Sequence, residues 1–434
     1  MKIKSLIYVP ALVLTGIFSV SAENIVPITS LTKNCKPLID KNFVLPKIQV
    51  RGLSERSHKR IARAQEKMAD ELYDESAELF KSLMESTKDQ FVKATAAKML
   101  GYVYSQKGDP AVASQYFTQA IELGRGYLQH QEIQDLTRNV AAFLFGNDEK
   151  KKSLGYLETW MKNSNKDDES IYLLYAAILA DSGRLRDSIC PAYWSAKVAK
   201  KPQKNAFGIM LNAHFEFKDF PGTILLLKQL ILDFPKEKRY WRNLSSIYVQ
   251  QDMIDDALAV MEMFYVQGLM ETENDYKQLS NIFAYSEIPY RTANILKEGI
   301  EKGVVKSTEK NWKNVAQNYH IASELDKAIH AYGKSAKESS HGKNDIKQAE
   351  LLADRYKYQK AIEAFDRGMK KGEIDDVGKV HFRKGIAYLE LKQFNRSIAS
   401  FEKATKYKKW RRQAVQYGSH AKNRKKQAAK LAAF

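Results

Sequence analysis

The feature that most constrains this chain is a pattern of aromatic, aliphatic and small residues that returns about every 34 residues. In its first half, an aliphatic residue follows an aromatic one by three places, a small residue comes next, and another aromatic residue follows three places later. The second half begins nine residues further on with a small residue and continues with bulky apolar ones. The clearest copy consists of Trp241, Leu244, Ser245, Tyr248, Ala257, Met261 and Phe264.

Further copies keep this spacing along most of the chain. The strictest are Ala97, Leu100, Gly101, Tyr104, Ala113, Phe117 and Ala120; Tyr276, Leu279, Ser280 and Phe283; Trp312, Val315, Ala316, Tyr319, Ala328, Tyr332 and Ser335; and Gly385, Tyr388, Ser397, Phe401 and Ala404. Weaker copies begin near Ser57, Gln134, Glu169, Lys204 and Gly342. The pattern is that of tetratricopeptide repeats, each a helix, a turn and a second helix, and it predicts about ten repeats between Ser57 and Arg411.

The spacing has a physical reason. Positions i, i+3, i+4 and i+7 share one face of a helix, so each first helix has one apolar stripe, and the small residues allow its partner to approach closely. Turn-forming residues at 107–110 and 181–183 fall between the two helices of a repeat. We therefore predict an all-α fold, a right-handed α-solenoid, rather than a plain antiparallel helical bundle.

The first 22 residues have the composition of a secretory signal peptide. Lys2 and Lys4 form a charged head, an apolar run follows, and small residues lead up to Ala22. The apolar run is shorter than the roughly 20 residues that a membrane-spanning helix needs. We therefore predict cleavage after Ala22 and export of the mature chain, rather than retention as an anchor.

Segments of different composition flank the repeats. Residues 23–56 contain Pro27, Pro37 and Pro46 and show no helical period, which predicts an extended N-terminal arm. The repeats are expected over residues 57–411. Residues 412–434 are rich in Ala and Lys and contain no acidic residue, which predicts a basic helix that caps the end of the solenoid.

The chain has two cysteines, too few for a disulfide-built scaffold. In an oxidising compartment Cys35 and Cys190 could pair and tie the arm to a repeat. Alternatively, Cys190 is a small core residue. The sequence leaves both possibilities open.

The formal net charge of +19 restricts the partners. Such a charge in a cytosolic protein would indicate nucleic acid, but export argues against that partner. Anionic lipid, cell-wall polymer and acidic protein surfaces remain. The eight histidines are scattered, and metal-ligand spacings, phosphate-binding loops and nucleophile motifs do not occur in the sequence. We expect no enzyme activity, cofactor or metal.

Several phrases of the sequence carry a more specific resemblance. They are RYWRNLS at 239–245, IPYRTA at 288–293, EKGVV at 301–305 and LDKAI at 325–329. From Ser57 onward the chain resembles periplasmic tetratricopeptide proteins found alongside TonB energy-transduction systems of Gram-negative bacteria. The resemblance implies a periplasmic location and an accessory role in the TonB–ExbB–ExbD machinery, which powers nutrient uptake across the outer membrane.

A binding site can be proposed from the first helices, because these line the concave face of such a solenoid. Three successive first helices carry cations and amides away from the apolar stripe; these are Lys277, Asn281, Asn314, Lys343 and Lys347. The set resembles the carboxylate clamp of chaperone-binding tetratricopeptide domains, in which ammonium and amide groups bind a peptide's terminal carboxylate. The alternative interpretation is a solvated basic face.

Two functional hypotheses follow. The first is an exported protein-interaction scaffold that assists TonB-dependent transport and binds a protein or peptide in its groove. The second is a cell-envelope assembly adaptor that binds cell-wall polymer or anionic lipid through its basic surface. Salt should weaken the second kind of binding more, because exposed charges are screened most.

Overall fold

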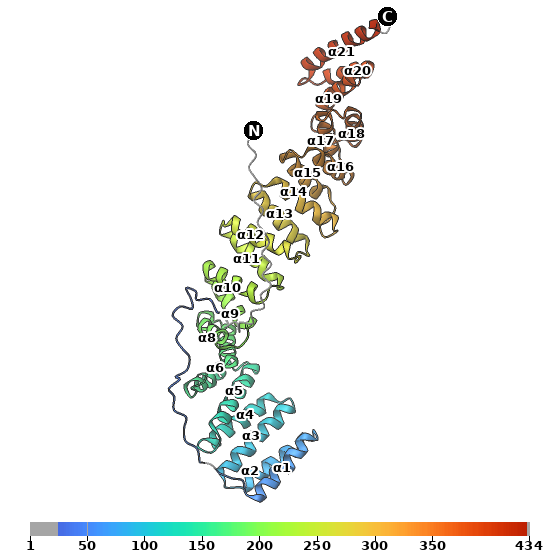
Figure 1. Cartoon of the computed structure of the whole chain (residues 1–434). Helices are drawn as coiled ribbons and strands as arrows, with labels where there is room; N and C mark the ends of the chain where they lie inside the picture. Colours follow the sequence, from blue (N-terminus) through green and yellow to red (C-terminus); the bar gives the residue numbers. More distant parts are fainter. Residues whose placement is uncertain (1–24, 50, 432–434) are drawn as a thin grey trace, which may run out of the picture. The chain divides into compact units, whose positions relative to one another are not determined.

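The computed structural model describes residues 25–49 and 51–431 of the 434-residue chain. Within these residues there are 21 helices and no strands (Figure 1). The first twenty helices form ten consecutive helix pairs, and α21 follows them. The predicted all-α solenoid of about ten repeats is confirmed. The predicted signal peptide lies outside the described residues.

Each repeat has a first and a second helix. The first helices are α1 (Glu55–Ala69), α3 (Gln90–Gln106), α5 (His130–Gly146), α7 (Glu169–Asp181), α9 (Lys204–Glu216), α11 (Lys238–Gln250), α13 (Glu273–Tyr285), α15 (Glu309–Ile321), α17 (Lys343–Asp354) and α19 (Val377–Glu390). The second helices are α2 (Tyr73–Ser86), α4 (Pro110–Gly124), α6 (Lys150–Lys162), α8 (Leu185–Val198), α10 (Phe220–Asp233), α12 (Ile254–Val266), α14 (Pro289–Glu301), α16 (Leu325–Lys337), α18 (Tyr358–Lys371) and α20 (Phe394–Thr405).

Most predicted starts of the weaker repeats agree with these bounds. Glu169 and Lys204 are the first residues of α7 and α9, and Gly342 immediately precedes α17. Gln134 lies inside α5, which begins at His130. This helix starts early because Glu132 and the N-cap residue Gln129 form a capping box ahead of the apolar stripe.

The helices divide into two compact blocks. The N-terminal block extends to Pro235 and contains α1 to α10, and the C-terminal block begins at Lys236 and contains α11 to α21. In both blocks each helix packs against the next one in the chain. This is the arrangement of a repeat array, in which every repeat contacts its neighbours only.

The small residues of the repeat lie where two helices come closest. A Cβ added to Gly101 in α3 would stand 2.4 Å from the ring of Phe117 in α4. At the corresponding place in the C-terminal block, a Cβ on Gly385 would stand 2.6 Å from the ring of Phe401. Both rings are fully buried, so the glycines provide the space that the aromatic side chains occupy.

One backbone feature recurs in the turn between the two helices of every repeat. Each turn contains a residue in the left-handed region, with φ between 55° and 81°. The ten residues are Glu71, Gly108, Asp148, Gly183, Lys218, Asp252, Glu287, Ser323, Tyr356 and Lys392. Only two of them are glycines, so the turn geometry is imposed mainly by packing of the helices that flank it.

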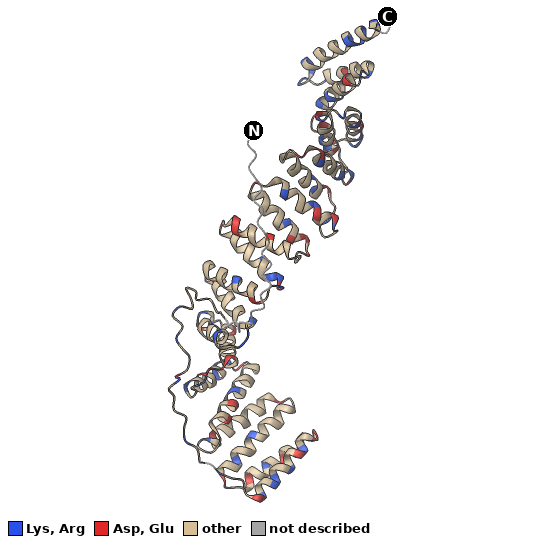
Figure 2. Cartoon of the chain, viewed as in Figure 1, with Lys and Arg blue, Asp and Glu red and all other residues tan. Residues whose placement is uncertain are grey.

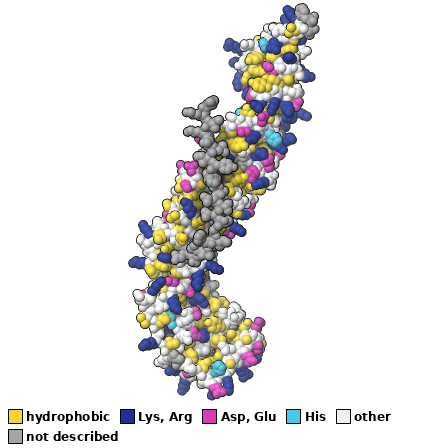
Figure 3. Space-filling view, viewed as in Figure 1, with side chains coloured by type: hydrophobic (Ala, Val, Ile, Leu, Met, Phe, Trp, Pro, Cys, Tyr) yellow, Lys and Arg dark blue, Asp and Glu magenta, His cyan; other side chains and the backbone are white. Residues whose placement is uncertain are grey.

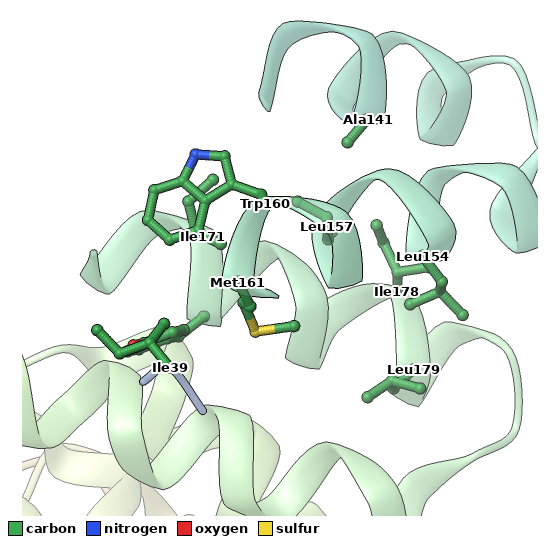
Figure 4. Close-up of a cluster of buried hydrophobic side chains, with 10 residues drawn as sticks. Ile39, Ala141, Leu154, Leu157, Trp160, Met161, Ile171, Ile178 and Leu179 are labelled. Atoms are coloured by element: carbon green, nitrogen blue, oxygen red, sulfur yellow. The ribbon is translucent and has the colours of Figure 1, made fainter. Parts of the chain in front are cut away.

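The described part of the arm ahead of α1, residues 25–49 and 51–54, contains no helix and runs along the N-terminal block in the direction opposite to the repeats (Figure 1). Near its start, Thr29 bonds to His214 in α9, and near its end the Gln49 N–H donates to the Gly126 carbonyl, 2.8 Å away, between α4 and α5. Between these points Ile39 is 7% exposed and joins a core cluster with Trp160 and Met161 (Figure 4).

A disulfide joins the arm to the array. Cys35 and Cys190 are bonded, with their Cα atoms 5.2 Å apart. Cys190 lies in α8, so the bond fixes the arm to the fourth repeat. Of the two possibilities that the sequence left open, the structure has the disulfide.

The chain ends in α21 (Arg411–Leu431). Ala414 and Ala421 are buried against the last repeat, and the Tyr417 ring contacts the rings of Phe382 and Phe401. Its other positions are largely exposed and include many Lys and Arg residues, with no acidic residue in the helix (Figure 2). Cationic side chains also stand out along other parts of the surface (Figure 3).

Candidate functional site on the first helices of the C-terminal block

The five residues of the predicted clamp all lie in the C-terminal block. Lys277 and Asn281 are one turn apart on α13, Asn314 is on α15, and Lys343 and Lys347 are one turn apart on α17. These are the first helices of three consecutive repeats, as the spacing predicted. Lys277 is about half-exposed and the other four are exposed.

The cations of this set already have acidic neighbours. Lys277 pairs with Glu273 at 2.6 Å, Lys343 with Asp375 at 2.7 Å, and the Lys347 Nζ lies 3.5 Å from Glu350. The hydrogen bond from Lys343 lowers the pKa of the Asp375 carboxyl. Lys343 and Asp375 are both exposed, so water and salt screen this pair, and an incoming carboxylate can compete with it at little cost. Glu273 and Glu350 are partly buried.

The amides are placed differently. The Asn314 Oδ1 accepts a hydrogen bond from the Asn318 Nδ2 at 2.8 Å, and Asn318 also donates to the Asn314 carbonyl at 3.0 Å. Within the described residues, the five side chains are not joined to one another by a hydrogen bond or an ion pair. The clamp therefore stays a prediction.

A buried ion pair lies beside this face and was not predicted. Asp275, at the start of α13, is fully buried and accepts from the Arg242 guanidinium at 2.7 and 3.0 Å. Burial acts to raise the pKa of Asp275, but hydrogen bonds from Arg242 and from the backbone of Glu271 and Thr272 lower it below its usual range. The carboxylate stays charged and ties α11 to the next first helix.

Sequence reasoning also missed a set of exposed apolar side chains. Tyr285 and Ile321 are the last residues of α13 and α15, and Tyr356 follows α17. Their exposed fractions are 72%, 71% and 80%. The sequence does contain a signal for this set. A large apolar residue recurs at the same end of three successive first helices, just outside the buried positions of the repeat. Exposed apolar groups in such a series are typical of contact surfaces.

The described residues contain no group of three His, Cys, Asp or Glu side chains that could hold a metal ion. In residues 25–49 and 51–431, no helix combines the length and the apolar character needed to cross a bilayer. The first-helix face presents ammonium, amide, carboxylate and apolar groups.

The comparison with protein families matches two of the helix pairs. A family model described as "Tetratricopeptide repeat" matches residues 99–124 and 378–409. The first stretch covers parts of α3 and all of α4, and the second covers most of α19 and all of α20. The chain carries tetratricopeptide repeats. Repeats of this kind form scaffolds for protein–protein interaction.

Solved structures with similarity to this chain include further tetratricopeptide proteins. A repeat protein from Parabacteroides merdae overlaps 60% of this chain and 97% of its own, at 11% identity and a TM-score of 0.34. The repeat domain of P58(IPK) overlaps 77% and 99%, at 14% identity and a TM-score of 0.24. YrrB, described as having an unusual peptide-binding site, overlaps 38% and 84%, at 13% identity and a TM-score of 0.29. No curated protein matches the sequence.

Proposed function

We propose that this chain is a periplasmic interaction scaffold that assists TonB-dependent transport by binding a protein component of the TonB–ExbB–ExbD machinery. The observation that carries the scaffold role is the face formed by α13, α15 and α17. It presents amides, screened cations and exposed apolar residues, and the described part of the chain contains no metal-ligand cluster that would indicate another chemistry.

The TonB association rests on the sequence phrases at 239–245, 288–293, 301–305 and 325–329. All four lie in the C-terminal block, in or beside helices α11 to α16. The same block carries the five clamp residues. The periplasmic location rests on the composition of residues 1–22.

The test is a crosslinking pull-down from intact periplasm, with the captured proteins identified by mass spectrometry. Wild type is compared with a triple variant carrying Lys277→Ala, Asn281→Ala and Lys343→Ala. A matched control carries Lys360→Ala, Lys370→Ala and Asn395→Ala, which lose the same groups from exposed positions on second helices.

We expect TonB-system proteins with wild type and with the control, and about tenfold less with the triple variant. Loss of one charge-assisted contact costs about 1.5–3 kcal/mol, so the loss of a single such contact would already reduce the affinity about tenfold. Recovery of cell-wall fragments or lipid alone, released by salt, would instead support the envelope-adaptor hypothesis. Equal recovery with both variants would show that the partner does not bind to the first-helix face.

A further inference from the structure

The arm shows how this array holds an extended chain. Residues 46–48 of the arm form one wall of a hollow of about 420 Å³ in the N-terminal block. The remaining walls come from α4 and the turn after it, from α5 and from α6. Two groups near the end of α6, Thr159 and Asn163, face this hollow, and the adjacent Gln49 N–H bonds to the Gly126 carbonyl. An extended segment thus lies over a second helix, the next first helix and the following second helix.

The C-terminal block has a hollow in the equivalent place. It has a volume of about 470 Å³ and is lined by α16, α17 and α18, again a second, a first and a second helix. Arg367 and Lys371 in α18 stand where Thr159 and Asn163 stand in α6, four residues apart near the end of the helix. We call this hollow, lined by residues of α16, α17 and α18, the basic hollow.

Cations dominate the lining of the basic hollow. Lys334 and Lys337 contribute from α16, and Arg367 and Lys371 from α18, whereas Asp345 is the only acidic residue. Lys334 and Lys337 have no acidic group within ion-pair distance in the described part of the chain. With four cations and one carboxylate, the lining has a net charge of +3.

The buried acid holds two of the cations in place. Asp345 is 1% exposed, its Oδ1 lies 3.2 Å from the Arg367 Nε, and its Oδ2 lies 2.8 Å from the Lys371 Nζ. The Arg367 Nη2 also donates to Gln348 at 2.9 Å, and Lys371 donates to the Ala336 carbonyl at 2.5 Å. Because both head groups are fixed, they lose little freedom when an anion binds.

We propose that the basic hollow binds an extended acidic segment of a partner protein, in the manner in which the N-terminal block holds its own arm. This inference deepens the scaffold function and rests on it. The carboxylates of the segment would accept charge-assisted hydrogen bonds from Lys334, Lys337 and Arg367. The arm of a second copy is a poor occupant, because its described residues up to Ser54 include five cations and one acid: Lys33, Lys36, Lys41, Lys47, Arg51 and Asp40.

The test uses the full mature chain and two labelled probe peptides, hexaglutamate and hexaglutamine, with binding followed by fluorescence anisotropy. Wild type is compared with a Lys334→Gln, Lys337→Gln variant. The matched control is a Lys360→Gln, Lys408→Gln variant, which loses the same charge from exposed positions outside the hollow. A Lys334→Arg, Lys337→Arg variant keeps the charge.

We expect hexaglutamate to bind wild type and the arginine variant, with affinity at least tenfold weaker in the glutamine variant and within twofold of wild type in the control. Hexaglutamine should not bind. Equal weakening in the glutamine variant and the control would overturn the proposal, because binding would then follow net charge alone. So would displacement of hexaglutamate by inorganic phosphate at equal concentration, which would indicate a free-anion site.

The same variants separate this inference from the scaffold proposal. If the glutamine variant still captures TonB-system proteins but no longer binds hexaglutamate, the scaffold role stands and its partner uses another surface. If wild type binds hexaglutamate in the hollow but captures no TonB-system protein, the hollow stands and the proposed machinery is wrong.

Discussion

The two blocks are built from the same helix pair, yet they are held together differently. In the C-terminal block, α11 to α21 pack each against the next, and the long-range ties include ion pairs and hydrogen bonds about one repeat apart, such as Arg242 with Asp275 and Tyr265 with Glu298. The N-terminal block has the same neighbour packing and, in addition, an arm that crosses several repeats. The difference shows that the repeats themselves suffice for a folded block and that the arm is an addition.

The arm is attached at points spread over the N-terminal block. Its contacts include the Thr29–His214 hydrogen bond, the Ser30–Asp219 hydrogen bond, the Cys35–Cys190 disulfide, the buried Ile39 side chain, the bond from Asn165 to the Phe43 carbonyl, and the Gln49–Gly126 backbone bond. These contacts join residues that are far apart in sequence, so they couple repeats that do not touch one another.

The largest expected difference between the blocks comes from removing the disulfide. The bond closes a loop over a sequence separation of 155. On chain-entropy grounds this stabilises by up to about 5 kcal/mol, and losses of about 2–5 kcal/mol are usual. In a Cys35→Ser, Cys190→Ser variant we expect hydrogen-exchange protection to fall in residues 25–235 and to stay unchanged in 236–431.

Each single serine variant is the control for this prediction. Either one breaks the same bond, so each should lower protection about as much as the pair does. Effects that add would mean that the cysteines contribute by packing rather than by their bond. A loss of equal size in both blocks would contradict the prediction that the bond stabilises the N-terminal block alone.

A smaller effect should be the same in both blocks. Gly101→Ala and Gly385→Ala each place a Cβ within 2.4–2.6 Å of a buried phenylalanine ring. Overpacking costs about 1–3 kcal/mol, and the gain in helix propensity returns about 1 kcal/mol. We expect a net loss of about 1 kcal/mol for each, measured as reduced protection of α3–α4 and of α19–α20. A much larger loss of stability from Gly101→Ala than from Gly385→Ala would show that the arm makes the N-terminal block less tolerant of an added side-chain atom.

The smallest effect should be a dependence on pH in the α9 region of the N-terminal block. Burial lowers the pKa of His214, and this outweighs its hydrogen bond to the Met210 carbonyl and the nearby Asp219. The ring stays neutral when folded, whereas an unfolded histidine takes up a proton below about pH 6.5. Stability is therefore lost as the pH falls through that value.

Hydrogen exchange of the α9 region at pH 7.5 and pH 5.5 measures this, after correction for the intrinsic exchange rate. His214→Gln should reduce the difference between the two conditions. His58→Gln is the control, because His58 is exposed and should leave the difference as it is in wild type. An unchanged pH dependence in the His214 variant would contradict the prediction.

The sequence predicts the repeats well because their signal is local. The aromatic, aliphatic and small residues at fixed spacing are the ones that are buried, for example Trp241, Leu244 and Phe264. The turns are harder to predict from the sequence. Each contains a residue with a left-handed backbone conformation, but this residue is a glycine only at Gly108 and Gly183. At Lys218 or Tyr356 the helices dictate the turn, and the residue type does not signal it.

The candidate sites depend on contacts between repeats, which one sequence does not display. The five clamp residues were placed correctly on their helices, but nothing in their spacing gave the pairing of Lys343 with Asp375. The predicted clamp does not include the basic hollow, because the cations of the hollow come from two second helices and the clamp residues come from first helices. Asp345 lies in the first turn of α17, and its sequence position does not reveal that it is buried beside Arg367 and Lys371.

The direction of the arm has a consequence for the order in which the protein can fold. Synthesis runs from the N-terminus, so the arm leaves the ribosome before the helices that it contacts. Ser30, for example, must wait for Asp219, which lies 189 positions later in the chain. The helix pairs can form one after another, because their contacts are local. The arm must wait for four or five of them. Docking of the arm is therefore expected to be the last and slowest step in the N-terminal block, and Cys35 must stay unpaired until the fourth repeat exists.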